Sequence, residues 1–473
     1  MSDLPCGWVQ AKLGDVVDRI EAGKSFRCIE RPPEAGQRGL VKISAVTWGD
    51  FREYESKTVP DGITVDDHLR IVEGDLLISR ANTIELVGAC VQAIAHSREL
   101  YLSDKVLRLA TPLIMRPWIK HYLATPAARK AIGEASTGNP LSMRNISQGA
   151  LLALDLPLAP PAEQQRIADK LDNLLARIDA CRDRLDRLPS LIDRLRQSAL
   201  TSAIQGSLTA DWRAANGGVV AGSEAETDEA AARSVSGWTY ERADAACSKV
   251  QSGGTPREGF IAAGGAPFLK VYNLVGQQVD FAYRPQFIAN EIHHGSMRKS
   301  ITLPGDVLMN IVGPPLGKVA VVPADYPQWN INQAITLFRA SPKVLSEWLY
   351  FVLCEGSAVR QVMPDTRGSV GQVNISLSQC RAFVLPVPPF DEQREAVRRL
   401  QKLFGFAQQL SDHLRDAEAS VNRLTPAVLA KAFRGELVPQ DPADEPAELM
   451  LQRLRAAEAP EPSARRRRRL AQP

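Results

Sequence analysis

Few residues in this chain have the types and the spacing that enzyme chemistry needs. Gly23-Lys24-Ser25 looks like the end of a phosphate-binding loop, but the first glycine of that motif would fall at Asp18. Asn310 precedes Pro314-Pro315 in a faint echo of the Asn-Pro-Pro-aromatic motif of amino-methyltransferases, but the residues are separated and no aromatic side chain follows. These motifs therefore predict neither a phosphate-binding loop nor a methyltransferase site in this chain.

Histidine and cysteine residues give no sign of a metal or nucleophilic centre. His293-His294 are neighbours, so they point away from each other in any regular element and are poorly placed as joint ligands. The pattern predicts no zinc site and no disulfide framework, and it fits the reducing cytoplasm. The seven cysteines are scattered and never spaced Cys-x-x-Cys: Cys6, Cys28, Cys90, Cys181, Cys247, Cys354 and Cys380.

Length and composition limit the class of protein further. A chain of 473 residues is too long for one ordinary core, so two or more domains are expected. Hydrophobic residues at 44% and charged residues at 23% are typical of a soluble globular protein. There is no signal peptide and no apolar run of about 18 residues, so we expect no membrane association. Net charge is only +3, so any nucleic-acid surface must be a local concentration of Lys and Arg.

The sequence is an internal repeat with a period near 230 residues. A period this long excludes a solenoid and predicts two similar domains in tandem. Five short matches support it: Gly7-Trp8 with Gly237-Trp238, Gly74-Asp75-Leu76-Leu77 with Gly305-Asp306-Val307-Leu308, Asn145-Ile146-Ser147 with Asn374-Ile375-Ser376, Pro160-Pro161 followed by Gln165-Arg166 with Pro388-Pro389 followed by Gln393-Arg394, and Gly206-x-Leu208 with Gly435-x-Leu437.

Each half has the same internal order of elements. Strand-like runs such as 40–44, 75–79 and 87–91 recur as 268–271, 306–309 and 318–322, with Gly and Pro between them. Short helical stretches, 116–123 and 345–354, follow in each half. We therefore expect an α+β fold, a tandem repeat of two α/β domains.

A Pro-rich stop and a long helix end each half. Apolar residues recur at alternating spacings of four and three, which predicts a heptad seam through which the two helices pack on each other. Pro189 should kink the first helix. The seam residues are Ile167, Leu171, Leu174, Ile178, Cys181, Leu185, Leu188, Ile192, Leu195 and Ala199, and then Ala396, Leu400, Leu403, Ala407, Leu410, Leu414, Ala417, Val421, Leu424 and Val428.

These patterns predict six segments. They are a first domain at 1–160, a central helix at 161–206, a linker at 207–236, a second domain at 237–389, a second helix at 390–434 and a partly disordered tail at 435–473. The run Arg465–Arg469 in that tail is either a solvated end or a non-specific phosphate contact.

The order and duplication of these motifs resemble the specificity subunits of type I restriction–modification systems over nearly the whole chain. The residues that carry the resemblance are Leu4-Pro-x-Gly-Trp8, Gly74-Asp-Leu-Leu-Ile-Ser-Arg-Ala-Asn82 with Val87-Gly88, the two Pro-Pro helix starts, Leu424–Leu437 and Leu451-x-Arg-Leu-Arg455. The resemblance implies that each domain is a target-recognition domain for one half of a bipartite DNA site. It also implies that the two helices pair as an antiparallel coiled coil, which forms a spacer and docks two modification subunits.

The same resemblance implies a non-enzymatic chain without a cofactor of its own. Adenine methylation with S-adenosylmethionine would belong to the modification subunits, and ATP- and Mg-dependent translocation and cleavage to motor–nuclease restriction subunits. The partners would then be double-stranded DNA and these subunits. The alternative is a coiled-coil scaffold without DNA specificity, which would not need two elaborate domains with divergent loops.

Polar residues after strands and in Gly-rich loops are the candidate DNA contacts, because Arg can form two hydrogen bonds to guanine and Asn two to adenine. In the first domain they are Lys42, Ser44, Arg80, Asn82, Lys105, Thr137, Asn139 and Arg144. In the second they are Lys270, Asn273, Asn310, Lys318, Arg367, Ser369 and Gln372. The stretch Gly305–Asn310 lacks the arginine of position 80, so the two half-sites should differ.

Overall fold

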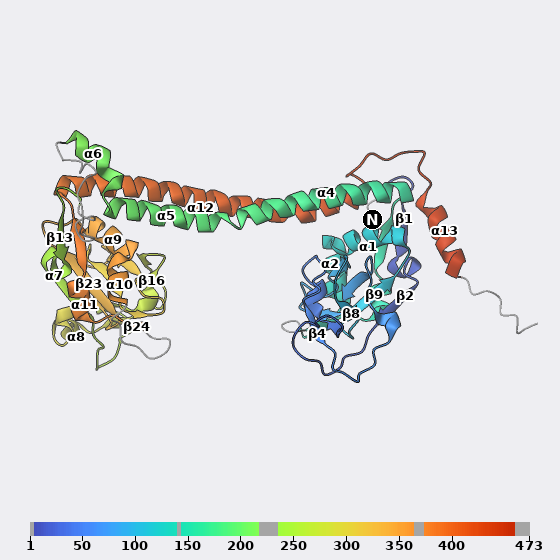
Figure 1. Cartoon of the computed structure of the whole chain (residues 1–473), viewed down its shortest axis with the longest axis horizontal. Helices are drawn as coiled ribbons and strands as arrows, with labels where there is room; N and C mark the ends of the chain where they lie inside the picture. Colours follow the sequence, from blue (N-terminus) through green and yellow to red (C-terminus); the bar gives the residue numbers. More distant parts are fainter. Residues whose placement is uncertain (1–3, 140–142, 217–234, 364–372, 459–473) are drawn as a thin grey trace, which may run out of the picture. The chain divides into compact units, whose positions relative to one another are not determined.

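The computed structural model describes residues 4–139, 143–216, 235–363 and 373–458. It divides into two compact units, which Figure 1 shows as an α+β domain with helical segments in each case. Unit 1 contains Met1–Asp186 and Asp416–Pro473, and unit 2 contains Arg187–Arg415. The boundary falls within the long helices, so each unit consists of one domain and a part of each long helix.

The two domains have one topology. The main sheet of unit 1 has the antiparallel order β2-β9-β5-β7, and that of unit 2 has the matching order β14-β23-β19-β21. These strands are β2 (Arg19–Ala22), β9 (Val106–Ala110), β5 (Leu76–Ser79), β7 (Cys90–Gln92), β14 (Cys247–Ser252), β23 (Ile335–Ala340), β19 (Val307–Asn310) and β21 (Val319–Val321). The predicted α+β tandem repeat is therefore confirmed.

Smaller sheets recur in both units. Each unit has a three-stranded sheet with one parallel pair, order β4-β3-β8 or β18-β15-β22, and a terminal antiparallel pair, β1-β12 or β13-β25. Their bounds are β3 (Arg38–Val41), β4 (Ser56–Thr58), β8 (Glu99–Tyr101), β15 (Ala266–Leu269), β18 (Phe287–Ile288), β22 (Asn330–Ile331), β1 (Val9–Lys12), β12 (Asp155–Leu158), β13 (Thr239–Arg242) and β25 (Val384–Val387).

The central strand β5 explains how each domain is layered. Successive side chains of a strand point to opposite faces, and Leu76 and Ile78 pack with the helices while Leu77 packs with the small sheet. In unit 2, Val307 and Leu308 of β19 divide between two cores in the same way. All four residues of each strand are buried, because the sheet lies between two apolar layers.

Short helices complete each domain. The predicted helical stretches are found as α1 (Arg116–Leu123) and α9 (Ser346–Glu355), and each buries a tryptophan whose indole donates to a backbone carbonyl of the terminal strand pair. The others are α2 (Pro126–Ala135), α3 (Gln148–Leu152), α7 (Ala243–Ala246), α8 (Asn290–His294), α10 (Ser357–Val362) and α11 (Leu377–Ala382).

The first long helix is interrupted where proline predicted it. α4 (Pro161–Leu185) ends, and α5 (Leu188–Ile204) begins with Pro189 at its second position. The second long helix is α12 (Phe390–Ala432). In unit 2 its pairing with α5 and the following α6 (Ala210–Ala215) is antiparallel: Arg213 bonds Glu392, Arg399 bonds Leu208, and Arg196 bonds Ser411.

The seam of the two long helices is only partly covered. Its ends are buried, as at Ile167 and Leu171 in unit 1 and at Ala396 and Leu400 in unit 2. Other positions are exposed: Cys181, Leu188, Leu195 and Leu424. A seam built from two helices alone leaves one side of its apolar residues open to solvent.

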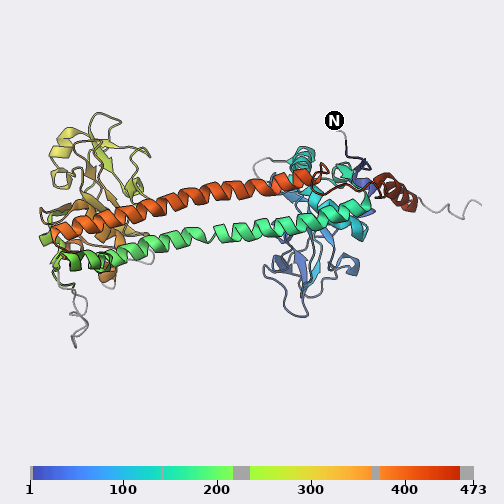
Figure 2. The same ribbon diagram turned by 90° about the horizontal axis from the view of Figure 1, so that it is seen from above.

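Residues from the far end of the chain complete unit 1. Phe433 packs on Trp118 with ring centroids 4.5 Å apart, and Arg166 pairs with Asp444 at 2.6 Å. α13 (Ala447–Glu458) adds Met450 and Leu451 to the core of the first domain. In Figure 2 the end of α12 lies beside the start of α4 in this unit. The predicted tail thus contacts the domain as far as Arg455, and Arg465–Arg469 lies outside the described residues.

Each long helix begins with a buried Glu-Gln pair. The indole of Trp8 donates to Glu163 at 3.0 Å, and that of Trp238 to Glu392 at 2.9 Å. The side chains of Gln164 and Gln393 both donate to a backbone carbonyl five residues earlier, at 2.8 Å. The structural repeat therefore aligns Gln164 with Gln393, and the sequence match of Gln165-Arg166 with Gln393-Arg394 was displaced by one residue.

The two glutamates differ in their second oxygen. Oε1 of Glu392 accepts from Arg213 at 2.6 Å and from Thr209 at 2.7 Å. Oε1 of Glu163 is buried and has no hydrogen-bond donor among the described residues. Burial raises the pKa of Glu163, and this exceeds the opposing effects of the Trp8 hydrogen bond and of Arg166, while Asp444 adds to the rise. Ionisation of Glu163 therefore lowers the free energy of unfolding of unit 1.

We expect two matched substitutions to differ strongly in their effect on stability. Glu392→Gln leaves Arg213 buried without its counter-ion and should destabilise unit 2 by about 3–5 kcal/mol. Glu163→Gln keeps an acceptor for Trp8 and removes the buried charge. It should change the free energy of unfolding of unit 1 by less than about 1 kcal/mol at pH 7. Hydrogen exchange of the β5 and β19 amides measures each unit separately.

The pH dependence provides the control. Because the folded pKa of Glu163 is raised, its cost is complete above that pKa and is relieved as pH falls toward the ordinary glutamate value. As pH falls through that window, the free energy of unfolding of wild-type unit 1 should increase. In Glu163→Gln this increase should be absent. Equal destabilisation by the two substitutions would contradict the assignment.

Candidate nucleic-acid interface

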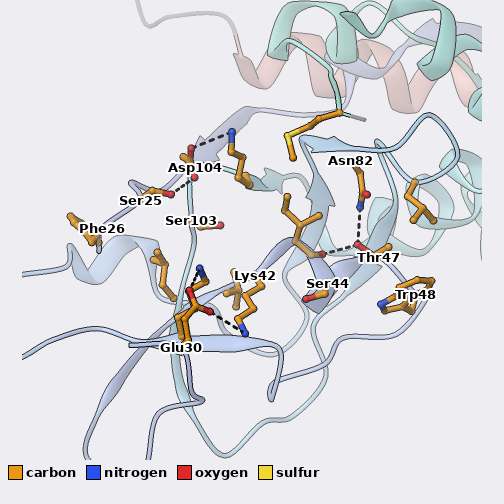
Figure 3. A pocket seen from close by; sticks show the side chains of 17 residues that line it. Ser25, Phe26, Glu30, Lys42, Ser44, Thr47, Trp48, Asn82, Ser103 and Asp104 are labelled. Atoms are coloured by element: carbon orange, nitrogen blue, oxygen red, sulfur yellow. Dashed lines mark hydrogen bonds and ion pairs between the residues drawn. The ribbon is translucent and has the colours of Figure 1, made fainter. Parts of the chain in front are cut away.

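A cavity of about 570 Å³ in unit 1 collects four of the predicted contact residues. Lys42 and Ser44 follow β3, Asn82 is in β6 (Ala81–Asn82), and Lys105 precedes β9. The main and small sheets bring these segments together, and Figure 3 shows the side chains of Lys42, Ser44 and Asn82 around one hollow, which Lys105 also lines. Strand ends that the sequence could only suggest separately thus form a single site.

Two groups of charged residues form opposite parts of the wall. Glu30 lies 2.5 Å from the ammonium of Lys57 and 3.7 Å from that of Lys42. The hydrogen bond from Lys57 is the main reason that the pKa of Glu30 is lowered. In the second group Asp104 accepts from Ser25 and lies 3.7 Å from Lys105. The cavity therefore offers both anionic acceptors and cationic donors (Figure 3).

The remaining polar side chains of the wall are partly engaged. Ser44 donates to Glu55 at 2.6 Å, and the Asn82 amide donates to Thr47 at 3.1 Å. Ser103 is 5% exposed, and its hydroxyl has no hydrogen-bond partner among the described residues. Four residues that were not among the predicted contacts also line the cavity: Glu30, Lys57, Asp104 and Trp48. Only the Asp104-Lys105 pair gave a local signal, a polar turn directly before a buried strand.

Arg80 has a fixed backbone and a free side chain. Its N–H donates to Lys105 at 2.8 Å, and its carbonyl accepts from Ile146 at 3.0 Å. Within the described parts of the chain, its half-buried guanidinium has neither a hydrogen-bond nor an ion-pair partner. Such a side chain is held at its base and remains available to a ligand.

The predicted polar loop lies beside β6. β10 (Thr137–Gly138) and β11 (Arg144–Asn145) form a hairpin, and β11 pairs with β6, so Thr137 and Asn139 are brought near Asn82 as exposed side chains. Arg144 is different, because its guanidinium donates to Ser136 and to the Gly133 carbonyl at the end of α2. This geometry favours a structural role for Arg144.

Two predicted residues of unit 2 have no exposed surface. Asn273 donates to the carbonyls of Asp280 and Tyr283, each at 2.9 Å. Asn310 donates to Pro315 at 2.7 Å and accepts from the Lys318 amide at 2.6 Å. Burial and these hydrogen bonds favour a structural role for both amides, which organise their loops.

The other predicted residues of unit 2 do not converge in the same way. Lys270 follows β15 as Lys42 follows β3, but its ammonium lies 4.3 Å from the ring of Phe260. Lys318 is half-buried at the start of β21. Arg367, Ser369 and Gln372 lie outside the described residues.

Matching hydrogen bonds identify the counterpart of Arg80. Ile375 donates to the carbonyl of Ile311 at 2.9 Å, as Ile146 does to that of Arg80. Ile311, which is 6% exposed, therefore occupies the place of Arg80, and Asn310 occupies the place of Ser79. The second domain therefore has an apolar side chain in the place of the arginine.

Searches for other kinds of site give negative results for the part of the chain that the structure describes. No group of three or more His, Cys, Asp or Glu side chains there could hold a metal ion. None of the helices within those ranges is long and apolar enough to cross a membrane.

Comparison with known proteins places this fold. The chain is 26% identical over 443 residues to the type I restriction enzyme EcoBI specificity subunit of Escherichia coli, covering 93% of this chain and 88% of that protein. It is 27% identical over 453 residues to the EcoKI specificity subunit of Escherichia coli strain K12, covering 94% and 92%. No model of a known protein family matches the chain.

Solved structures share the architecture. One, from a study of complex assembly and conformational transition of the type I R-M system, has a TM-score of 0.60 at 17% identity and covers 92% of this chain and all of that one. The HsdS subunit of Thermoanaerobacter tengcongensis has a TM-score of 0.54 at 20% identity and covers 92% and 98%. The fold is thus that of a tandem-domain HsdS protein. The sequence similarity to type I restriction enzyme specificity subunits extends over more than nine-tenths of this chain, and the fold is shared with the solved HsdS structure.

Proposed function

We propose that this chain is the non-catalytic specificity subunit of a type I restriction–modification complex, and that each of its domains reads one half of a bipartite, asymmetric DNA site. The observation that carries the proposal is one backbone framework with different side chains at matched positions. Arg80 and Ile311 have equivalent main-chain hydrogen bonds, yet only the first offers a guanidinium. Arg recognises guanine through two parallel hydrogen bonds, which isoleucine cannot make.

The long helices supply the second part of the proposal, docking of two modification subunits that also recruit motor–nuclease subunits. Leu188, Leu191 and Leu195 are exposed on α5 at 38%, 46% and 36%. Their spacing places them on one face of the helix. A partner helix packed on this face would stabilise the complex by about 25 cal/mol for each Å² of apolar surface that it covers. S-adenosylmethionine, ATP and Mg would be used by those partners, in the cytoplasm.

Methylation mapping tests the proposal against a scaffold without DNA specificity. The chain and its modification partner are expressed together, and methylated adenines are mapped genome-wide. We expect two unlike short half-sites separated by an unspecified gap. A single ungapped palindrome, or the same methylation pattern without this chain, would contradict the proposal.

Arg80→Ala tests the first domain. Loss of a bidentate base contact should weaken binding of the correct first half-site by about 1–3 kcal/mol and relax its sequence, with the second half-site still read. Binding is measured on duplexes that vary one half-site at a time. Arg19→Ala, which removes a 70%-exposed arginine, is the control. A uniform loss over all sequences would instead make Arg80 a phosphate contact.

A heptad insertion tests the helices as a ruler. Seven residues added to both helices, between Leu174 and Leu185 and between Leu403 and Leu414, preserve the seam and add about 10 Å. This length corresponds to roughly three base pairs, so the gap should lengthen with both half-sites unchanged. Insertion into one helix only is the control, because it breaks the match of the seams. An active double insertion with the original gap would show that the helices do not set the spacing.

A further inference from the structure

We propose that the unit 1 cavity receives one unstacked nucleobase from the first half-site, a base with an exocyclic amino group. The inference rests on the proposed function, because it assumes that this domain contacts DNA. It goes further by naming the part of the DNA that the cavity holds.

The shape of the site is the first argument. Bases of a stacked duplex present their edges at the floor of a groove, so a side chain that reads them must project from the protein. Lys42, Asn82 and Lys105 instead line a hollow of about 570 Å³. A hollow can hold only a part of the DNA that protrudes, either the sugar–phosphate backbone or a base turned out of the helix.

The charge of the wall distinguishes these two ligands. A phosphate seat needs cations that are free to replace counter-ions. Here all three lysines of the wall already face a carboxylate: Lys42 and Lys57 face Glu30, and Lys105 faces Asp104. The two carboxylates offset two of the three lysine charges, so little positive charge remains for a phosphate, and the mixture of donors and acceptors suits a neutral ligand.

Aromatic and apolar side chains at the cavity point to a base in particular. Trp48 is 57% exposed although it is a large apolar side chain, and Phe26 and Met143 also line the hollow. Stacking on an aromatic ring is the usual way in which proteins hold an unpaired base. Ser103, whose buried hydroxyl lacks a partner among the described residues, can supply a hydrogen bond at the wall (Figure 3).

The carboxylates select the kind of base. Glu30 and Asp104 can accept hydrogen bonds from an exocyclic amino group, and the neighbouring lysines can donate to a ring nitrogen or carbonyl oxygen. Adenine, cytosine and guanine carry an amino group, whereas thymine does not. The expected ligand is therefore one of the first three bases.

Binding to mismatched duplexes tests this inference with the full chain in complex with its modification subunits. In turn, the base opposite each position of the first half-site is replaced so that the pair cannot form. A base that enters the cavity must first leave its pair, so a mismatch removes part of that cost. At one amino-bearing base we expect binding to tighten by about 5- to 10-fold, whereas an ordinary mismatch weakens binding by about 5- to 150-fold.

Two variants connect the effect to the cavity. Trp48→Ala should abolish the preference for the mismatched duplex, and a thermal melt verifies that the variant is folded. Tyr54→Ala is the matched control, because Tyr54 is a 64%-exposed aromatic residue of the same domain that does not line the cavity. It should leave the preference unchanged.

The outcomes separate the two proposals. Specific binding of the matched duplex with weakening at every mismatch would overturn the unstacked base and leave the proposed function intact. The same would follow if the tightening persisted in Trp48→Ala, or if it occurred only at thymine. Failure of the complex to distinguish its site from random DNA would overturn the proposed function itself.

Discussion

A buried carboxylate at the start of each long helix holds the helix to its domain. Glu163 and Glu392 each accept a hydrogen bond from an indole that belongs to the first turn of the domain. A negative charge in the first turn is favoured by the helix dipole, while the surrounding apolar core disfavours it. In unit 2 Arg213 compensates the buried charge of Glu392. In unit 1 one oxygen of Glu163 has no donor among the described residues. Each junction therefore joins the start of a long helix to the start of its own domain.

Much of the fold could be predicted because periodic patterns report burial directly. The run Leu76-Leu77-Ile78 is apolar on both faces, and the structure places an apolar layer on each side of it. The heptad spacing likewise predicted the paired helices, and Pro189 predicted the interruption between α4 and α5. The exposure of Leu188 and Leu195 could not be predicted, because a sequence does not state how many helices share a seam.

The candidate site was harder to predict, because a polar side chain can turn toward solvent or toward its own backbone. Lys42 and Lys105 face the cavity, but Asn273 and Asn310 of the same predicted set are wholly buried in loop hydrogen bonds. Glu30 and Lys57 were missed because their relation is purely spatial: they are 27 positions apart and come together only across the small sheet. Neither outcome leaves a local signal in the sequence.

The contribution of the C-terminal segment to unit 1 has a consequence for synthesis. Most of the first domain is synthesised before unit 2, but Met450 and Leu451 of its core and Phe433, which packs against that core, are synthesised after unit 2. Unit 2, residues 187–415, is continuous and is synthesised in the interval, which at about 5–20 residues per second lasts roughly ten to fifty seconds. The first domain can therefore complete its core only after unit 2 has been synthesised. During that interval the apolar surface around Trp118 is not yet covered by Phe433.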